Sequence, residues 1–168
     1  GPASMACMVP DFDHPDGIEV DLGCDQVGID VRPLPAAPAG FTGAVADAQL
    51  TGAIDRRAIR ADESVQVTFR LNGTGNLRLA APPSLDELAD FEIFDRKIDD
   101  SLAVEDGRPS GTKVVRYTLL PRRPGPLAIP PVRYVVYVPG HGYRSLDWPG
   151  ARIDVAPGLA RGGTGQAP

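Results

Sequence analysis

The sequence has little cysteine, little histidine and no long apolar run in its 168 residues. No stretch approaches the roughly 18 apolar residues that a membrane-spanning helix needs. The net charge is −5, with 22 acidic and 17 basic residues, and this balance argues against nucleic-acid binding, which needs clustered lysine and arginine. We therefore expect no nucleic-acid partner, and membrane attachment only through other parts of a longer protein.

The two cysteines, Cys7 and Cys24, both lie near the start of the chain. In an oxidising compartment they could form a disulfide, and two free thiols are the alternative. No second cysteine or histidine pair accompanies them at ligand spacing, so we expect no structural zinc. Residues 11–17 are superficially similar to a calcium loop, but Asp16 stands where glycine is required. We expect no metal and no cofactor.

Catalytic constellations are also scarce. The only histidines are His14 and His141, which makes a catalytic triad improbable. The motif Gly73-Thr74-Gly75 lacks the lysine and the following helix of a phosphate-binding loop. Acids at positions 86–106 could supply two carboxylates for glycoside hydrolysis, but interspersed basic residues favour a solvated charged face. The chain is expected not to be an enzyme, and no residue is assigned a catalytic role.

Glycine and proline are abundant, with 19 and 18 residues, which favours turns and short strands over helices. Apolar and polar residues alternate over positions 64–71, which predicts a strand with one buried face. The residues expected on that face are Val65, Val67, Phe69 and Leu71. Residues 72–76 then predict a tight turn between strands, with a positive φ at Gly73 or Gly75.

Further strands are predicted at residues 27–32, 91–96, 101–105, 112–120, 132–138, 143–146 and 152–155. The one helical fragment is expected at residues 84–90, with Ser84 as N-cap and Glu87 as its capping-box partner. Turn signals separate most strands by about 8 to 12 residues, without longer amphipathic helices. This pattern predicts an all-β, immunoglobulin-like antiparallel β-sandwich with at most one or two short helical turns.

The local composition divides the chain into three segments. Residues 1–26 are interpreted as vector residues and an irregular arm or the remnant of a preceding domain. Residues 27–156 are expected to form the sandwich, with a proline-rich connector at 35–40. Residues 157–168 have the composition of a flexible linker.

The turn at residues 139–144 is the candidate partner-binding loop. It joins two apolar strands, and its aromatic and arginine side chains are types enriched at binding hot spots. The residues assigned to this contact are His141, Tyr143 and Arg144. An ordinary solvated hairpin tip is the alternative. Likewise, Tyr134, Tyr137, Tyr143 and Trp148 could form an aromatic platform for sugar or peptide, although core packing also explains them.

Several short motifs occur in the order seen in one bacterial family. They are Ile29-Asp30-Val31-Arg32-Pro33-Leu34-Pro35, Phe41-Thr42-Gly43-Ala44-Val45, Leu71-Asn72-Gly73-Thr74-Gly75-Asn76-Leu77-Arg78-Leu79 with Pro82-Pro83, and Tyr117-Thr118-Leu119-Leu120-Pro121-Arg122-Arg123-Pro124-Gly125 with Ile129-Pro130-Pro131-Val132. On these residues the chain resembles the BatD family, also called oxygen-tolerance or aerotolerance proteins. The resemblance covers about residues 27–156.

The resemblance implies a secreted bacterial protein with tandem immunoglobulin-like domains and a C-terminal membrane anchor, facing the periplasm or the cell exterior. It also implies work beside von Willebrand A-domain proteins and a MoxR-type ATPase, in a stress-response complex. No catalytic residues are assigned to such proteins, so none is carried over. We interpret the chain as a non-catalytic scaffolding domain. The alternative is a carbohydrate-binding module or a β-sandwich associated with a glycoside hydrolase.

Overall fold

The computed structural model describes residues 4–9, 13, 18–23, 28, 30–85, 88–105 and 107–159. The chain divides into two units, Gly1–Leu34 and Pro35–Pro168. In the first unit, β1 (Ser4–Val9) pairs antiparallel with β2 (Ile18–Gly23). These residues form paired strands in place of the expected irregular arm, and the alternative, a remnant of a preceding domain, stays a prediction. Ser4 and Met5, interpreted as vector residues, lie in β1, and the alternation of Ile18, Val20 and Leu22 with acids was an unused strand signal.

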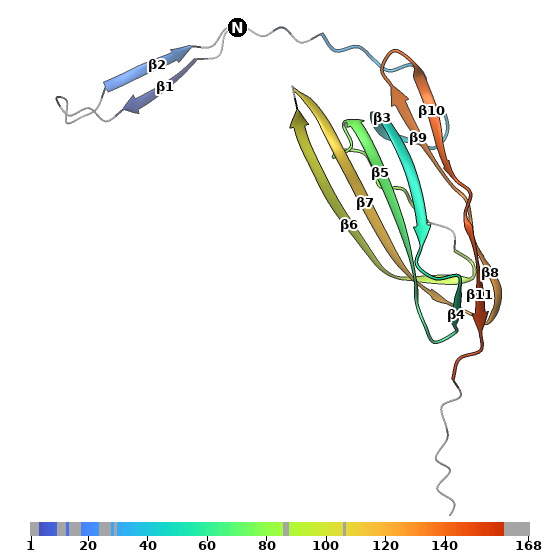
Figure 1. Ribbon diagram of the computed structural model, residues 1–168. Helices are drawn as coiled ribbons and strands as arrows, with labels where there is room; N and C mark the ends of the chain where they lie inside the picture. The colour runs from blue at the N-terminus through green and yellow to red at the C-terminus, as the bar shows by residue number, and fades with distance from the viewer. Residues whose placement is uncertain are drawn as a thin grey trace, which may run out of the picture. The chain divides into compact units, whose positions relative to one another are not determined.

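The second unit consists of nine strands in two sheets (Figure 1). They are β3 (Phe41–Ile54), β4 (Ala58–Arg60), β5 (Val65–Gly75), β6 (Phe91–Glu105), β7 (Arg108–Pro121), β8 (Gly125–Ile129), β9 (Val132–Val138), β10 (Gly142–Trp148) and β11 (Ala151–Ala156). One sheet has the order β10-β9-β3-β5-β7-β6 and the other the order β4-β11-β8. This arrangement confirms the all-β, immunoglobulin-like sandwich.

Two strand pairs depart from the expected antiparallel pattern. β3 pairs with β9 in parallel, and β11 pairs with β4 in parallel and with β8 antiparallel. The chain leaves the six-stranded sheet at Ile54 and enters the three-stranded sheet at Ala58, so it changes layers within a few residues. This change of layer places β4 beside the last strand of the fold.

β5 forms the centre of the core. Val65, Val67, Phe69 and Leu71 have exposed fractions of 0%, which confirms the predicted buried face. The first three pack with residues of β7, β8 and β11 in one apolar cluster between the sheets, and Leu71 joins a second cluster with β3 and β9. Burial of such side chains contributes about 1.5–3 kcal/mol each relative to exposure.

The turn predicted at residues 72–76 is wrong as a connection between paired strands. β5 continues to Gly75, and its neighbours are β3 and β7. Gly75 does have a positive φ of 128°, and a Cβ there would meet the Val45 carbonyl oxygen at 2.3 Å. A single turn follows, in which the amides of Leu79 and Ala80 donate to the Asn76 carbonyl at 2.9 and 3.2 Å.

The remaining connection to β6, here called the crossover segment (residues 76–90), contains no helix in its described residues. The predicted helical fragment is therefore absent from residues 84–85 and 88–90, and Asp86 and Glu87 lie outside the described residues. Leu85 is buried in the core with an exposed fraction of 2%, and Leu88 packs against it. These apolar anchors hold the chain against the sheets, where tertiary packing overrides the local helix signal.

Other differences concern strand boundaries. The described residues between positions 28 and 38 belong to no strand, whereas a strand was expected at 27–32; Val27 and Ile29 lie outside the described residues. The two strands expected at 91–96 and 101–105 are one continuous strand, β6. β4 and β8 were not predicted, because three and five residues give too little periodicity.

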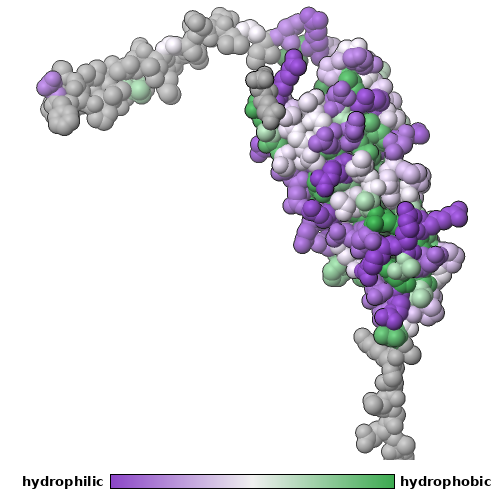
Figure 2. Space-filling model, in the orientation of Figure 1, coloured by the Kyte–Doolittle hydropathy of each residue, from purple (hydrophilic) through white to green (hydrophobic). Residues whose placement is uncertain are grey.

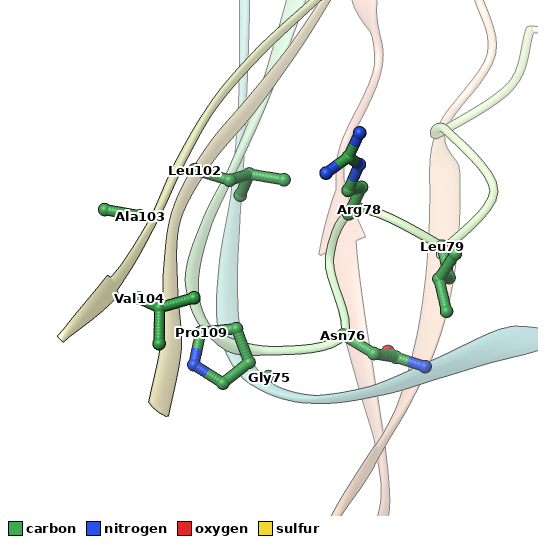
Figure 3. A pocket seen from close by; sticks show the side chains of 8 residues that line it. All are labelled: Gly75, Asn76, Arg78, Leu79, Leu102, Ala103, Val104 and Pro109. Carbon is green, nitrogen blue, oxygen red and sulfur yellow. The ribbon is translucent and has the colours of Figure 1, made fainter. Parts of the chain in front are cut away.

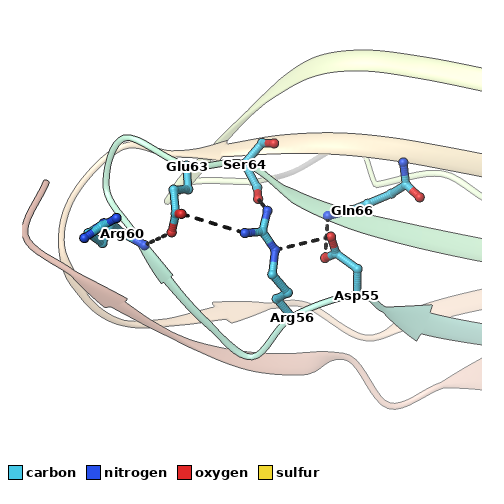
Figure 4. Close-up of polar contacts among 6 residues, drawn as sticks. All are labelled: Asp55, Arg56, Arg60, Glu63, Ser64 and Gln66. Atoms are coloured by element: carbon cyan, nitrogen blue, oxygen red, sulfur yellow. Dashed lines mark hydrogen bonds and ion pairs between the residues drawn. The ribbon is translucent and has the colours of Figure 1, made fainter.

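A polar network stabilises the corner between β3, β4 and β5 (Figure 4). The Arg56 guanidinium donates to the Ser64 carbonyl at 2.6 Å and lies 3.9 Å from the Glu63 carboxylate. The Asp55 carboxylate accepts a hydrogen bond from the backbone amide of Gln66 at 2.8 Å. The Glu63 carboxylate accepts one from the backbone amide of Arg60 at 2.8 Å. These bonds fix the turns through which the chain changes sheets.

Candidate functional site

Two tyrosines and a lysine bind the crossover segment to the sheet. The Tyr117 hydroxyl donates to the Pro83 carbonyl at 2.9 Å, and the Tyr134 hydroxyl donates to the Ala81 carbonyl at 2.6 Å. Lys113, with an exposed fraction of 5%, directs its ammonium to the Arg78 carbonyl and to the Asp100 carboxylate, each at 3.4 Å. Buried polar groups need such partners, so the segment is held in a defined position.

Burial raises the pKa of Tyr134, and a side-chain hydrogen bond with Thr42 offsets part of that rise. The cause is the removal of water, which disfavours the charged phenolate. The hydroxyl therefore stays a donor to the crossover segment at neutral pH.

An apolar hollow of about 550 Å³ lies between the start of the crossover segment and the far end of the β6–β7 hairpin (Figure 3). Leu79 is 83% exposed and Val104 is 71% exposed, while Leu102 is half-buried. The lining residues are Gly75, Asn76, Arg78, Leu79, Leu102, Ala103, Val104 and Pro109. We call this site the crossover hollow.

The chemistry of the crossover hollow suits binding better than catalysis. Among the described lining residues, Arg78 is the one charged residue, and none of them is an acid, a histidine, a cysteine or a hydroxyl residue. Within the described residues, no group of three or more His, Cys, Asp or Glu side chains could hold a metal ion. Exposed large apolar side chains beside a concave surface are typical of a site that receives an apolar side chain from a partner.

The predicted partner-binding loop contains two side chains that already have structural contacts. The Tyr143 ring packs edge-on against Phe41 and Tyr137, each at 5.1 Å between centroids, and its hydroxyl donates to the Pro35 carbonyl at 2.8 Å. The Arg144 guanidinium donates to the Ala48 carbonyl at 2.7 Å and to the Asp47 carboxylate at 2.8 Å.

His141 differs from these two neighbours. It is exposed at the tip of the turn, and its ring nitrogen lies 3.3 Å from the carbonyl of Pro139 in the same turn. The structure thus brings His141, Tyr143 and Arg144 together around one shallow depression with Asp47 and Val138. The assignment of this loop as a contact surface stays a prediction.

The proposed aromatic platform is largely inside the protein. Tyr134 is 3% exposed and Trp148 is 8% exposed, and Trp148 packs edge-on against Phe69 with its centroid at 5.2 Å. The described acids of the 86–106 cluster alternate between the two faces of β6, as the pairing of Asp99 with Val114 and of Asp100 with Lys113 shows. Both observations favour packing and solvation over sugar binding. Figure 2 shows hydrophobic and hydrophilic residues intermingled on the face in view.

The remaining predicted site residues lie in the first unit. Cys7 is half-buried on β1, opposite Val20. Cys24 and His14 lie outside the described residues, so the disulfide between Cys7 and Cys24 stays a prediction.

The crossover hollow was not predicted. Its lining combines residues 75–79 with residues 102–109, and only the pairing of strands brings these segments together. A usable signal was the apolar residue Leu79, four residues after the glycine-rich strand end at Gly75.

Comparison with known proteins gives one match. A family model described as BatD DUF11 like domain matches residues 53–148, more than half of the chain. The matched range includes β4–β10 and confirms the resemblance found from the sequence motifs. No curated protein and no solved structure matches the chain. Among the described residues, no helix is both long enough and apolar enough to span a membrane.

Proposed function

Because the chain belongs to the BatD family, we propose that its β-sandwich is a non-catalytic protein-interaction domain in a bacterial envelope complex. The expected partners are von Willebrand A-domain proteins of the same system, acting together with a MoxR-type ATPase. The proposal places the domain in the periplasm or at the cell exterior, with the longer parent protein anchored to the inner membrane. A role in oxygen tolerance and stress response belongs to the same proposal.

The observation that carries this proposal is the crossover hollow. Leu79 and Val104 are large apolar side chains, 83% and 71% exposed, on two segments that are held in place by strand pairing and by the Asn76 turn. Such preformed surfaces cost little ordering on binding. An apolar side chain of the partner would fill the hollow and cover both residues.

The experiment measures binding of the purified domain to a purified von Willebrand A domain of the same system. Leu79→Asp and Val104→Asp should each weaken binding by about tenfold or more, because a charge would be buried in the contact. Leu159→Asp is the matched control, since Leu159 is also an exposed leucine, with an exposed fraction of 68%, outside the hollow. Equal affinity of all three variants and the parent would reject the hollow as the contact site.

A further inference from the structure

β6 is an edge strand with an unusual charge pattern. In the described part of the chain it has one neighbour, β7, so the other side of its backbone is open. Fifteen residues make it longer than most edge strands, and an open edge can template pairing with another chain. A bulge between Ile93 and Asp95 interrupts the pairing with β7, and from Asp95 to Glu105 the pairing is regular.

The regular stretch contains a run of two cations, one apolar residue and two anions. Arg96 and Lys97 precede Ile98, and Asp99 and Asp100 follow it. The pairing with β7 shows which of them share a face. Arg96, Ile98 and Asp100 lie on the face of Tyr117, Val115 and Lys113, whereas Lys97 and Asp99 lie on the opposite face with Arg116 and Val114.

We propose that two copies of this chain pair antiparallel through their β6 edges, about a two-fold axis at Ile98. In this register Arg96 lies opposite Asp100 of the second copy, and Lys97 lies opposite Asp99 of the second copy. The symmetry repeats both pairs, so opposite charges meet on both faces of the continuous sheet. Directly opposite residues on antiparallel strands interact, and such an isologous contact closes as a dimer.

The pattern also favours this register over its symmetric neighbours. Along Asp95–Ser101, the pairing about Ile98 brings no two like charges together, whereas a two-fold axis at Lys97 or at Asp99 places two like charges directly opposite each other. Charges on an edge strand commonly prevent pairing, because a single sign repels a copy of itself. Here the two signs are arranged symmetrically about Ile98, so the same edge attracts its copy.

Lys97, Ile98 and Asp99 are exposed at the open edge, whereas the Asp100 side chain is 34% exposed and lies 3.4 Å from the Lys113 ammonium. Lys97 is 73% exposed at its side chain and Asp99 is 64% exposed, and Ile98 is 42% exposed. Asp99 forms an ion pair with Arg116 of the neighbouring strand, and Lys97 lies 3.9 Å from Asp95. Pairing would add partners to these ions and would cover Ile98 with its own counterpart.

The dimer does not depend on the proposed function. The bulge ends the regular ladder at Asp95, which pairs with Ser101 in the proposed register, so the ladder stops before the residues of the crossover hollow. Loss of dimerisation and loss of partner binding are therefore separate results.

The test is a charge exchange followed by sedimentation velocity at about 100 µM protein, where a micromolar Kd gives mainly dimer. The parent should sediment as a dimer. Lys97→Asp places acids opposite Asp99, and Asp99→Lys places cations opposite Lys97, so each variant alone should be monomeric. An equimolar mixture of the two variants should recover the dimer, because opposite charges meet again in the mixed pair.

Arg133→Asp is the matched control. Arg133 is 73% exposed at its side chain and is ion-paired with Asp147 at 2.9 Å, away from β6, so this variant should remain a dimer. The double variant Lys97→Asp with Asp99→Lys should also be a dimer, which keeps the test valid if Asp99→Lys alone disturbs Arg116 and fails to fold. A monomeric parent, or Lys97→Asp that dimerises like the parent, would overturn the proposal.

A cross-link tests the position of the axis. With Cys7 and Cys24 replaced by serine, Ile98→Cys places two thiols directly opposite each other, within the Cα separation that a disulfide tolerates. Oxidation should give covalent dimers. Val104→Cys should not cross-link, because the two copies of residue 104 would lie roughly 40 Å apart in this register. Equal cross-linking at both positions would contradict the two-fold axis at Ile98.

Discussion

Gly52 on β3 lies directly against the indole ring of Trp148, the last residue of β10. A Cβ at Gly52 would lie 2.6 Å from both Cδ1 and Nε1 of that ring. The indole N–H donates to the Gly52 carbonyl at 3.0 Å, and the ring fills the core beside Phe69. One glycine thus admits the only tryptophan of the chain into the interior.

We predict that Gly52→Ala destabilises the sandwich by about 1–3 kcal/mol, because the added methyl group displaces a buried ring. Thermal unfolding and the fluorescence of Trp148 report the change. Gly140→Ala meets no atom within 4 Å but is strained by the positive φ of 80° at that position, so it should lower the unfolding temperature and leave that fluorescence unchanged. An unaltered emission spectrum and unfolding temperature for Gly52→Ala would refute this packing.

Val67→Asp should abolish cooperative unfolding. Val67 has an exposed fraction of 0% and lies in the centre of the core, so the substitution buries a charge without a partner. Gln66→Asp, on the exposed face of the same strand, introduces the same charge and should unfold cooperatively. The measurement is circular dichroism on heating, and a sigmoidal transition for Val67→Asp would argue against the core assignment.

The raised pKa of Tyr134 predicts that the free energy of unfolding changes with pH in the alkaline range. Burial raises its pKa, so the folded protein retains the phenol proton to higher pH than the unfolded chain does. Its contribution to the free energy of unfolding is therefore complete below the unfolded pKa of about 10 and decreases as the pH rises above it. Tyr134→Phe, which loses the bond to the Ala81 carbonyl, should be less stable by about 1 kcal/mol at neutral pH.

The difference in free energy of unfolding between the unsubstituted protein and Tyr134→Phe should become smaller between pH values of about 9 and 11. The reason is that the variant cannot ionise at this position. Urea denaturation of both proteins across that range measures it. A constant difference would show that Tyr134 does not couple folding to proton binding.

Arg144→Ala should lower the free energy of unfolding by about 1 kcal/mol, mainly through the lost bond to the Ala48 carbonyl, because its ion pair with Asp47 is exposed. His141→Ala should leave stability unchanged, since that ring contacts its own turn. His141 is therefore the cleaner probe of the predicted partner-binding loop. If His141→Ala reduces capture of the von Willebrand A domain while Leu79→Asp does not, the contact lies at this loop.

The sequence was most informative where one strand face is buried along its whole length. The alternation of β5 predicted four buried residues correctly, because a period of two has a direct physical cause in the pleated backbone. The helix signal gave no helix at the described residues 84–85 and 88–90, because a short capping motif contributes about 1 kcal/mol, less than the burial of Leu85 in the core. Short strands such as β4 carry one buried residue, Ile59, and show no period.

The candidate surfaces were harder to predict because they depend on which segments are neighbours. Leu79 and Val104 are far apart in the chain, and only the sheet order places them at one hollow. The charges around Ile98 are visible in the sequence, but they become informative only when β6 is known to be an edge. The pattern of apolar residues in a strand shows which of its own side chains are buried. It does not show which strand lies at the edge of the sheet.

The parallel pairing of β4 with β11 has a mechanical consequence. The chain enters the sandwich at Phe41, at the start of β3, and leaves it at Ala156, at the end of β11, toward the opposite end of the sandwich (Figure 1). Tension applied at these two points pulls β11 along its own axis against β4, which is held back through β3. The hydrogen bonds between the two strands are then loaded in shear, all at once, so the sandwich resists stretching more strongly than a ladder that is opened one bond at a time.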